Sequence, residues 1–168
     1  MTEPDMKNLF LDAYEAHADA IYRHCFFRVY SRTRAEELVQ ETFMRAWKYL
    51  QDGKVIDNIR AFLYRVAGNL IIDESRKKKE SSLDALMESE EMPFEPSNND
   101  HRDIAHKAIF REVLDKLRKI PENDRELVTL RFVDDLDPKE IGEITGMSAN
   151  NVSVRIHRAL ESLKIKIQ

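Results

Sequence analysis

The chain of 168 residues lacks the paired cysteines of disulfide-linked proteins and the long apolar runs of membrane-spanning proteins. Cys25 is the only cysteine, so the sequence can form neither an intrachain disulfide nor a zinc site of several cysteines. No apolar run approaches the roughly 20 residues of a membrane span, and residues 1–8 are too polar for a secretory signal. These absences predict a cytoplasmic protein with no direct membrane insertion.

Glycine and proline are also scarce, with four and five copies, which favours long helices over strands joined by turns. Apolar residues recur at helical steps of three and four before residue 80 and again from residue 104 onward. Between these segments, residues 81–103 are rich in Ser, Asn, Glu and Pro and predict a linker. The predicted fold is therefore all-α, with two small helical domains, 1–80 and 104–168, joined by a flexible acidic linker.

Local signals predict where helices of the first domain begin and end. Thr33 and Glu36 have the spacing of a capping box, so a helix is expected to open at Thr33. Gly53 interrupts the apolar periodicity and marks residues 51–58 as a loop. Gly68 is expected on the exposed face of the next helix, where it should cost about 1 kcal/mol relative to Ala.

The sharpest local pattern lies near the C-terminus. Asp137 can cap a helix that begins at Pro138, and Gly146 supplies the positive φ of a tight exit from that helix. Ser148 can cap the helix that follows, and Gly142 stands where the two helices would approach closely. A helix, a short glycine turn and a second helix form a helix-turn-helix, whose second helix enters the major groove of DNA.

The exposed side of that second helix carries groups that suit nucleic acid. Asn can pair with adenine and Arg with guanine, at roughly 1–3 kcal/mol of discrimination per good pair, and Val can meet a thymine methyl. Residues 147–160 include no acidic residue, whereas the solvated face of an ordinary helical hairpin normally mixes charges. Arg155, on the flank, could instead pair with Glu140 of the preceding helix. The exposed set is Asn150, Val154, His157, Arg158 and Glu161, with Asn151 and Ser153 beside it.

The net charge of −4 conceals an uneven distribution. Residues 81–109 carry a net charge of −5, whereas residues 60–79 carry +4 and residues 147–168 carry +3. Both basic segments fall on predicted helices. A mildly acidic chain therefore still offers two surfaces for a polyanion.

Three segments, in this order, resemble bacterial sigma factors. The run AEELVQETFMRAW at residues 35–47 resembles their polymerase-binding segment. The run NIRAFLYRVAGN at residues 58–69, with Asp73 and the basic residues that follow, resembles the helix that recognises and melts the −10 element. Residues 120–131 and the helix-turn-helix resemble the domain that recognises the −35 element. The length and the lack of other sigma domains make this a resemblance to the extracytoplasmic-function group.

The resemblance implies a protein that binds core RNA polymerase, recognises −10 and −35 promoter elements and assists promoter opening. The residues implied in binding core polymerase are Glu37, Gln40, Glu41 and Met44. Those implied in binding the −10 element are Gly53, Lys54, Asn58, Arg65, Asn69, Arg76, Lys77 and Lys78. Those implied in binding the −35 element are Ser148, Asn150, Asn151, Ser153, Val154, His157 and Arg158.

The same resemblance implies no catalysis, no cofactor and no metal, with core RNA polymerase, promoter DNA and an anti-sigma factor as partners. The five histidines show no metal-binding spacing, which agrees with that expectation. The sequence departs from the family in places: Phe62 replaces a more usual tryptophan, and Ser153 and Val154 stand where a basic residue and a serine are frequent. These departures leave the preferred −35 sequence unpredicted.

Two alternatives remain open from the residues alone. The acidic linker is either a solvated tether or a segment that threads the polymerase channel later used by RNA. Only in the second case should replacement by Gln of Glu88, Glu90, Glu91 and Glu95 alter initiation or promoter escape. The chain as a whole could instead be a stand-alone helix-turn-helix regulator that binds an operator as a dimer, or a helical adaptor that binds only proteins.

Overall fold

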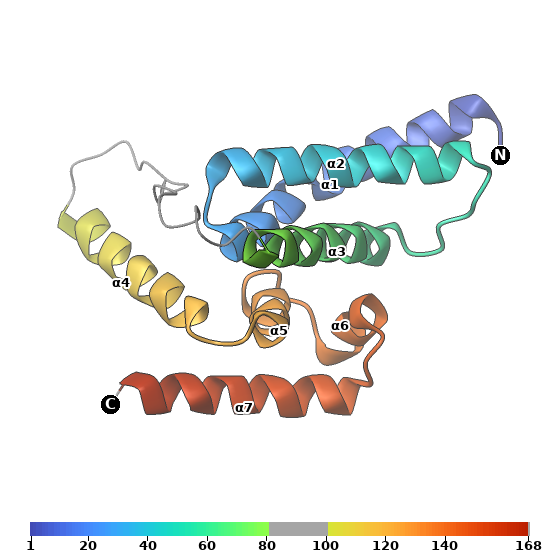
Figure 1. Cartoon of the computed structure of the whole chain (residues 1–168). Coiled ribbons are helices and arrows are strands. Elements are labelled where there is room, and N and C mark those ends of the chain that lie inside the picture. The colour runs from blue at the N-terminus through green and yellow to red at the C-terminus, as the bar shows by residue number, and fades with distance from the viewer. Residues whose placement is uncertain (81–100, 168) are drawn as a thin grey trace.

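The computed structural model describes residues 1–80 and 101–167, and these form helices and no strand (Figure 1). The helices are α1 (Glu3–Val29), α2 (Arg32–Gln51), α3 (Ile59–Glu80), α4 (His101–Arg118), α5 (Glu122–Phe132), α6 (Pro138–Thr145) and α7 (Ala149–Ile167). The predicted all-α fold class is thus confirmed. The predicted linker lies outside the described residues up to position 100, and α4 begins before the expected domain start at 104. No helix in the two described ranges has both the length and the apolar character needed to cross a bilayer.

A short polar side chain caps the N-terminus of each of the first three helices. Thr2 caps α1, and Asn58 caps α3 by accepting a hydrogen bond from the amide of Ala61 at 3.0 Å. Ser31 caps α2, so the expected start at Thr33 is wrong. The reason is the brevity of the α1–α2 connection: Tyr30 ends α1 with φ 57° and the next residue, Ser31, is already extended. Thr33 therefore lies inside the first turn.

Helix α3 lies between two groups of helices (Figure 1). On one side are α1 and α2, which pack on each other and on α3. On the other side are α5 and α6, and α7 lies across them on the side away from α3. The two halves of the chain are therefore in direct contact, chiefly α3 with α6 and α1 with α5.

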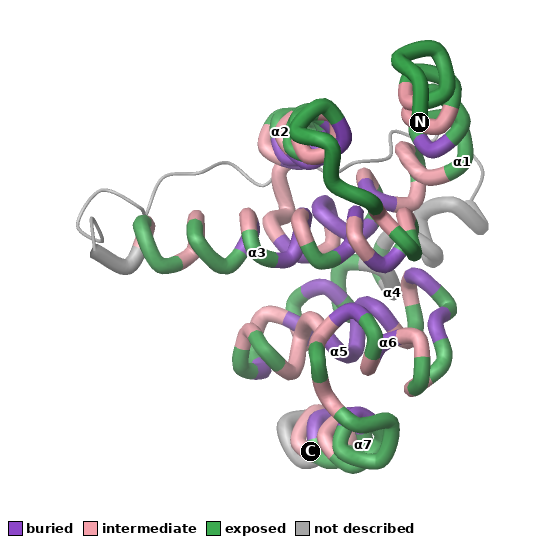
Figure 2. Tube along the Cα trace, turned by 90° about the vertical axis from the view of Figure 1, so that its right-hand side faces the viewer, coloured by how far each residue is buried: buried purple, intermediate pink, exposed green. Residues whose placement is uncertain are grey.

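The buried residues form a core that continues from one half into the other. Figure 2 shows them along α3 and on the facing parts of α5 and α6. Ile21 and Leu63 belong to the same apolar cluster as Leu130, Leu136 and Ile141. Full burial of such a side chain stabilises the fold by roughly 1.5–3 kcal/mol. The two predicted domains thus share apolar packing in this structure.

Candidate nucleic-acid interface

The residues implied in polymerase binding form a stripe along α2. Their spacing of three and four residues places Glu37, Gln40, Glu41 and Met44 on adjoining turns of one helix face. Met44 is 66% exposed, which is unusual for so large an apolar side chain. Glu41 accepts a hydrogen bond from Nε of Arg45 at 2.9 Å, so its carboxylate is held at the surface.

An apolar groove of about 670 Å³ runs between α1 and α2 beside this stripe. Its lining includes Gln40 and Met44 from the stripe and the exposed Leu11 of α1. Trp47 is half-buried and lines the groove, with its ring centroid 5.2 Å from that of Phe10. The stripe therefore borders an apolar surface large enough to accept side chains of a partner.

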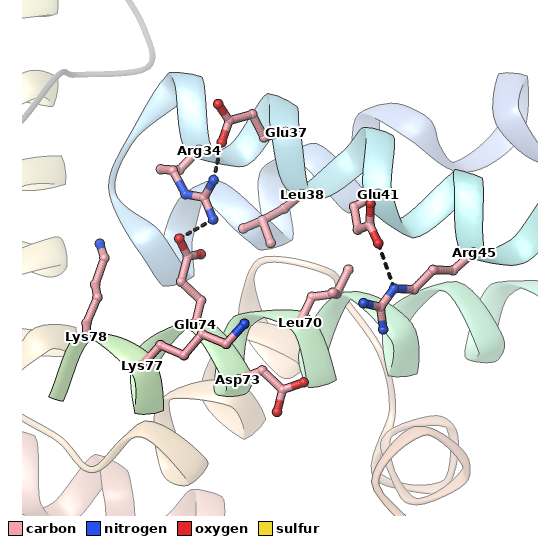
Figure 3. A pocket seen from close by; sticks show the side chains of 10 residues that line it. All are labelled: Arg34, Glu37, Leu38, Glu41, Arg45, Leu70, Asp73, Glu74, Lys77 and Lys78. Atoms are coloured by element: carbon pink, nitrogen blue, oxygen red, sulfur yellow. Dashed lines mark hydrogen bonds and ion pairs between the residues drawn. The ribbon is translucent and has the colours of Figure 1, made fainter. Parts of the chain in front are cut away.

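A second depression, of about 510 Å³, lies between α2 and α3 (Figure 3). Glu37 and Glu41 line it from α2, and Lys77 and Lys78 line it from α3. Arg34 bridges Glu37 to Glu74 of α3 and so ties the two helices together. The residues implied in polymerase binding and the basic end of the implied −10 set thus meet at one place.

The rest of the implied −10 set lies on the α2–α3 loop and on α3. Gly53 has φ 77°, a left-handed conformation that favours glycine, and it is exposed. Lys54 lies over the ring of Tyr49, 4.9 Å from its centroid. Asn69 and Arg76 are exposed on α3.

Two members of this set, Arg65 and Asn58, are engaged by the other half of the chain. Arg65 donates from Nη2 to the carbonyl oxygen of Glu143 at 2.6 Å and from Nε to that of Ile144 at 3.3 Å. Asn58 donates from Nδ2 to the Glu143 carboxylate at 3.2 Å. All these acceptors belong to α6, the first helix of the helix-turn-helix. No local pattern predicts this contact, because it joins residues that lie 78 to 85 positions apart in the sequence.

The local geometry of the helix-turn-helix is as predicted. Asp137 and Glu140 form a reciprocal capping box at the start of α6, and Gly146 ends that helix with φ 77°. Ser148 accepts a hydrogen bond from the amide of Asn151 at 3.1 Å and so caps α7. A Cβ on Gly142 would lie 2.6 Å from the carbonyl oxygen of Met147, which confirms the expected close approach.

Helix α7 buries one face and exposes the other. Val152, Ile156 and Ala159 are buried, whereas the implied −35 residues are all exposed, Val154 to 39%. The exposed set consists of Ser148, Asn150, Asn151, Ser153, Val154, His157 and Arg158. Because α7 lies at the outer edge of the molecule, this face meets no other helix (Figure 1) in the described part of the chain.

Arg155 has a structural partner, but the expected one is wrong. Its guanidinium donates two hydrogen bonds to Oδ1 of Asp124 in α5, at 2.6 Å from Nη2 and 3.1 Å from Nε. Glu140 instead faces Arg60 of α3, at 3.6 Å. The expectation considered only contacts within the helix-turn-helix. In the structure, α5 supplies the partner of Arg155 and α3 supplies the partner of Glu140.

A buried polar cluster between the halves was missed by sequence reasoning. The Asp134 carboxylate lies 2.8 Å from Nδ1 of His24 and accepts a hydrogen bond from Tyr64 at 3.2 Å. Burial and the Asp134 charge both raise the pKa of the Tyr64 phenol above its ordinary range. The three residues come from α1, α3 and the α5–α6 connection, so no local pattern in the sequence links them.

Arg28 and Gly68 also lie at the contact between the two halves, where both face α5. The Arg28 side chain is wholly buried, 3.6 Å from the Glu122 carboxylate and 3.9 Å from that of Glu126. Burial lowers the pKa of its guanidinium, while the two carboxylates oppose that shift. Gly68 was expected to be exposed, and this is wrong: it is buried, and a Cβ there would lie 2.7 Å from Oε1 of Glu126. Helix α5 covers the face of α3 that looked free in the sequence.

Two family matches cover most of the described chain. Sigma-70 region 2 matches residues 13–81 and sigma-70 region 4 matches residues 110–163. The chain is 28% identical over 172 aligned positions to the ECF RNA polymerase sigma factor SigW of Bacillus subtilis, covering 96% of this chain and 90% of that protein. It is 30% identical over 155 positions to the ECF RNA polymerase sigma factor SigM of the same organism, covering 91% of each.

Two solved structures share the fold. One is CnrH in complex with the cytosolic domain of CnrY, with a TM-score of 0.69 and 22% identity over 96% of this chain and 88% of that chain. The other is the sigma factor RpoE in complex with the anti-sigma factor NepR from Bartonella quintana, with a TM-score of 0.66 and 21% identity over 95% and 94% of the two chains.

Proposed function

Because the chain belongs to the extracytoplasmic-function group of RNA polymerase sigma factors, we propose which of its surfaces bind which part of the transcription complex. Core polymerase binds the α2 stripe, the −10 element binds the α2–α3 loop and α3, and the −35 element binds α7. The polymerase supplies the chemistry of RNA synthesis, and this chain supplies contacts and no catalytic residue. Its place of action is the cytoplasm, where bacterial transcription takes place.

The observation that carries the proposal is the exposed face of α7. Its donors and acceptors stand clear of every helix described, and residues 147–160 contain no acidic side chain that would repel phosphates. Arg158 and Asn150 have the bidentate geometry that guanine and adenine accept in the major groove. The buried side of α7 meanwhile fixes the helix on α5 and α6, so the exposed side is presented rigidly.

The −10 element requires a different kind of contact, because a base must leave the stack to be recognised. Unstacking costs a few kcal/mol, which hydrogen bonds and aromatic surface in the pocket must offset. We assign that pocket to the loop at residues 51–58 with Asn69. The basic run Arg76, Lys77 and Lys78 then holds the backbone phosphates, a contact that is blind to sequence.

Polymerase binding combines apolar and polar contacts. Interfaces of this kind have an apolar centre and a polar rim, and the α1–α2 groove with Met44 and the neighbouring Glu37 and Gln40 offers both. The same exposed groove supports the proposal that an anti-sigma factor binds the chain, since a partner that covers it would withhold the chain from polymerase. The similar structure of RpoE from Bartonella quintana is a complex with the anti-sigma factor NepR.

The test mixes the purified chain with core RNA polymerase and a pool of templates with randomised promoters. We expect the chain to co-migrate with the core enzyme and the transcripts to share −10 and −35 sequences. An operator-binding regulator would instead shift duplex DNA without polymerase, and an adaptor would give neither result. Absence of co-migration with core polymerase would contradict the proposal.

A further inference from the structure

The end of α2 fixes the first residues of the loop to which the proposed function assigns the −10 element. Gly53, with φ 77°, turns the chain back, and its amide donates to the carbonyl oxygen of Leu50 at 3.0 Å. The amide of Lys54 donates to the carbonyl oxygen of Tyr49 at 3.4 Å. Two such hydrogen bonds form a Schellman motif, in which the chain returns to the last turn of the helix it has just left. The backbone therefore holds Lys54 beside Tyr49.

The side chains of these two residues make a second contact. The Lys54 ammonium lies over the Tyr49 ring, with Nζ 4.9 Å from the ring centroid. An aromatic face attracts a cation at this range, because the ring quadrupole is negative there. An exposed lysine otherwise samples many rotamers. The ring therefore restricts where the Lys54 charge lies.

The Tyr49 ring is in turn fixed by α3. Its centroid lies 4.9 Å from that of Phe62, and the two ring planes are tilted by 48°. Phe62 belongs to the first turn of α3, and its amide donates to the carbonyl oxygen of Asn58 at 3.0 Å. Both rings are half-buried. The Lys54 ammonium is thus placed relative to α3, the helix that carries Asn69, and not by the loop alone.

A ring holds an ammonium without neutralising it, whereas a carboxylate would compete with DNA for the charge. Lys54 is exposed, and no carboxylate forms an ion pair with it in the described part of the chain. We propose that Tyr49 is a positioning residue for promoter DNA: its carbonyl and its ring hold Lys54 so that the ammonium meets a phosphate of the −10 strand. A side chain held in place loses less freedom on binding, so the contact is tighter. The inference rests on the proposed function, which assigns residues 51–58 to the −10 element.

The first experiment examines the contact in the free, full-length chain by NMR. Lysine is labelled with ¹³C at Cε, and the Lys54 signal is identified by its absence from Lys54→Met. Protons above an aromatic ring resonate upfield, so the Lys54 ε-methylene protons should lie upfield of those of the other lysines. Tyr49→Phe keeps the ring and should retain this shift, and Tyr49→Leu should lose it. An ordinary Lys54 shift in the wild type would overturn the inference.

The second experiment measures the promoter affinity of the holoenzyme as a function of salt concentration. Lys54→Met should reduce the slope of log affinity against log salt by about 0.7, the value for one phosphate of a single strand. Lys116→Met removes an equal charge from α4 and is the matched control, with an unchanged slope. Tyr49→Leu should weaken promoter binding about two- to fivefold, as expected for loss of an exposed cation–π contact. Tyr49→Phe should restore most of that loss.

A double-mutant cycle separates positioning from a general effect on the fold. In the Lys54→Met background, Tyr49→Leu should cause no further loss of promoter affinity. An equal loss in both backgrounds would mean that Tyr49 only supports the end of α2, and the inference would be wrong. It would also be wrong if Lys54→Met left the salt slope unchanged.

Binding of core polymerase is measured on the same samples. If the wild-type chain binds core polymerase and promoter DNA but the cycle shows no coupling, the inference falls alone. If the wild-type chain does not bind core polymerase, the proposed function falls and the inference falls with it.

Discussion

Two helical glycines, Gly68 and Gly142, offer a matched test of how this structure tolerates an added methyl group. A Cβ on Gly68 would lie 2.7 Å from an oxygen of Glu126, and a Cβ on Gly142 would lie 2.6 Å from an oxygen of Met147. The two contacts are almost equally short. They differ in that the first oxygen ends a flexible side chain and the second belongs to the backbone of the helix-turn-helix.

The expected free energies differ accordingly. Replacing Gly by Ala inside a helix stabilises it by about 1 kcal/mol. At Gly142 the Met147 carbonyl cannot yield without shifting the turn, which the Gly146 amide holds by its 2.9 Å hydrogen bond to the Gly142 carbonyl. Overpacking costs about 1–3 kcal/mol, and a clash with a backbone atom that cannot yield belongs to the upper part of that range, about 2–3 kcal/mol. After the gain in helix propensity, Gly142→Ala should therefore lose about 1–2 kcal/mol of unfolding free energy.

At Gly68 the Glu126 carboxylate can rotate away and give up only its 3.9 Å ion pair with Arg28. The gain in helix propensity and this loss nearly cancel, so Gly68→Ala should change stability by less than about 0.5 kcal/mol. The measurement is urea unfolding of both variants, followed by circular dichroism and by the fluorescence of Trp47, the only tryptophan. For a chain of this size, 1 kcal/mol corresponds to roughly 2–4 °C in Tm.

Either of two results would refute the reasoning. If Gly142→Ala is as stable as the wild type, the turn is free to move and the close backbone contact does not constrain it. If Gly68→Ala loses as much stability as Gly142→Ala, the distinction between a side-chain and a backbone neighbour has no energetic meaning here. A holoenzyme assay adds a second readout, because a shifted α7 in Gly142→Ala should weaken −35 binding while core binding persists.

Three further predictions concern single side chains. Arg158→Ala should cost the holoenzyme about 1–3 kcal/mol of −35 binding, measured by promoter affinity, without loss of core binding; loss of both would contradict the assignment. Burial raises the pKa of the Cys25 thiol to about 12, from an ordinary value of 9.0. The unfolded chain releases this proton near pH 9 and the folded chain retains it, so the contribution of Cys25 to the unfolding free energy should be constant below pH 9 and fall above it by up to about 1.4 kcal/mol per pH unit. The decline of unfolding free energy above pH 9 should therefore be less steep in Cys25→Ala. Arg155→Ala should cost about 0.5–1 kcal/mol of stability, and a double-mutant cycle with Asp124→Ala should assign that loss to the pair.

Local chemistry explains which features could be predicted from the sequence. Asp137, Gly146 and Ser148 act on backbone groups within four residues of themselves, so their spacing alone places the ends of α6 and α7. The helical periodicity works for the same reason, because a helix face is set by steps of three and four. These features depend on neighbours in the sequence and not on partners elsewhere in the fold.

The features that sequence reasoning missed depend on partners far along the chain. Asp134 meets His24 across 110 positions, and Arg155 meets Asp124 across 31. Gly68 looked exposed because nothing in residues 1–80 covers it; α5 does. The assignment of residues to polymerase and to each promoter element stays a prediction, since it depends on partners outside this chain.

The neutral acceptors of Arg65 in α6 differ from phosphate oxygens in how they respond to ionic strength. Phosphates carry a condensed layer of counterions, whose release on binding becomes less favourable as salt rises. The carbonyl oxygens of Glu143 and Ile144 carry no such layer. Raising the salt concentration would therefore weaken a phosphate contact of Arg65 and leave its contact with α6 almost unchanged.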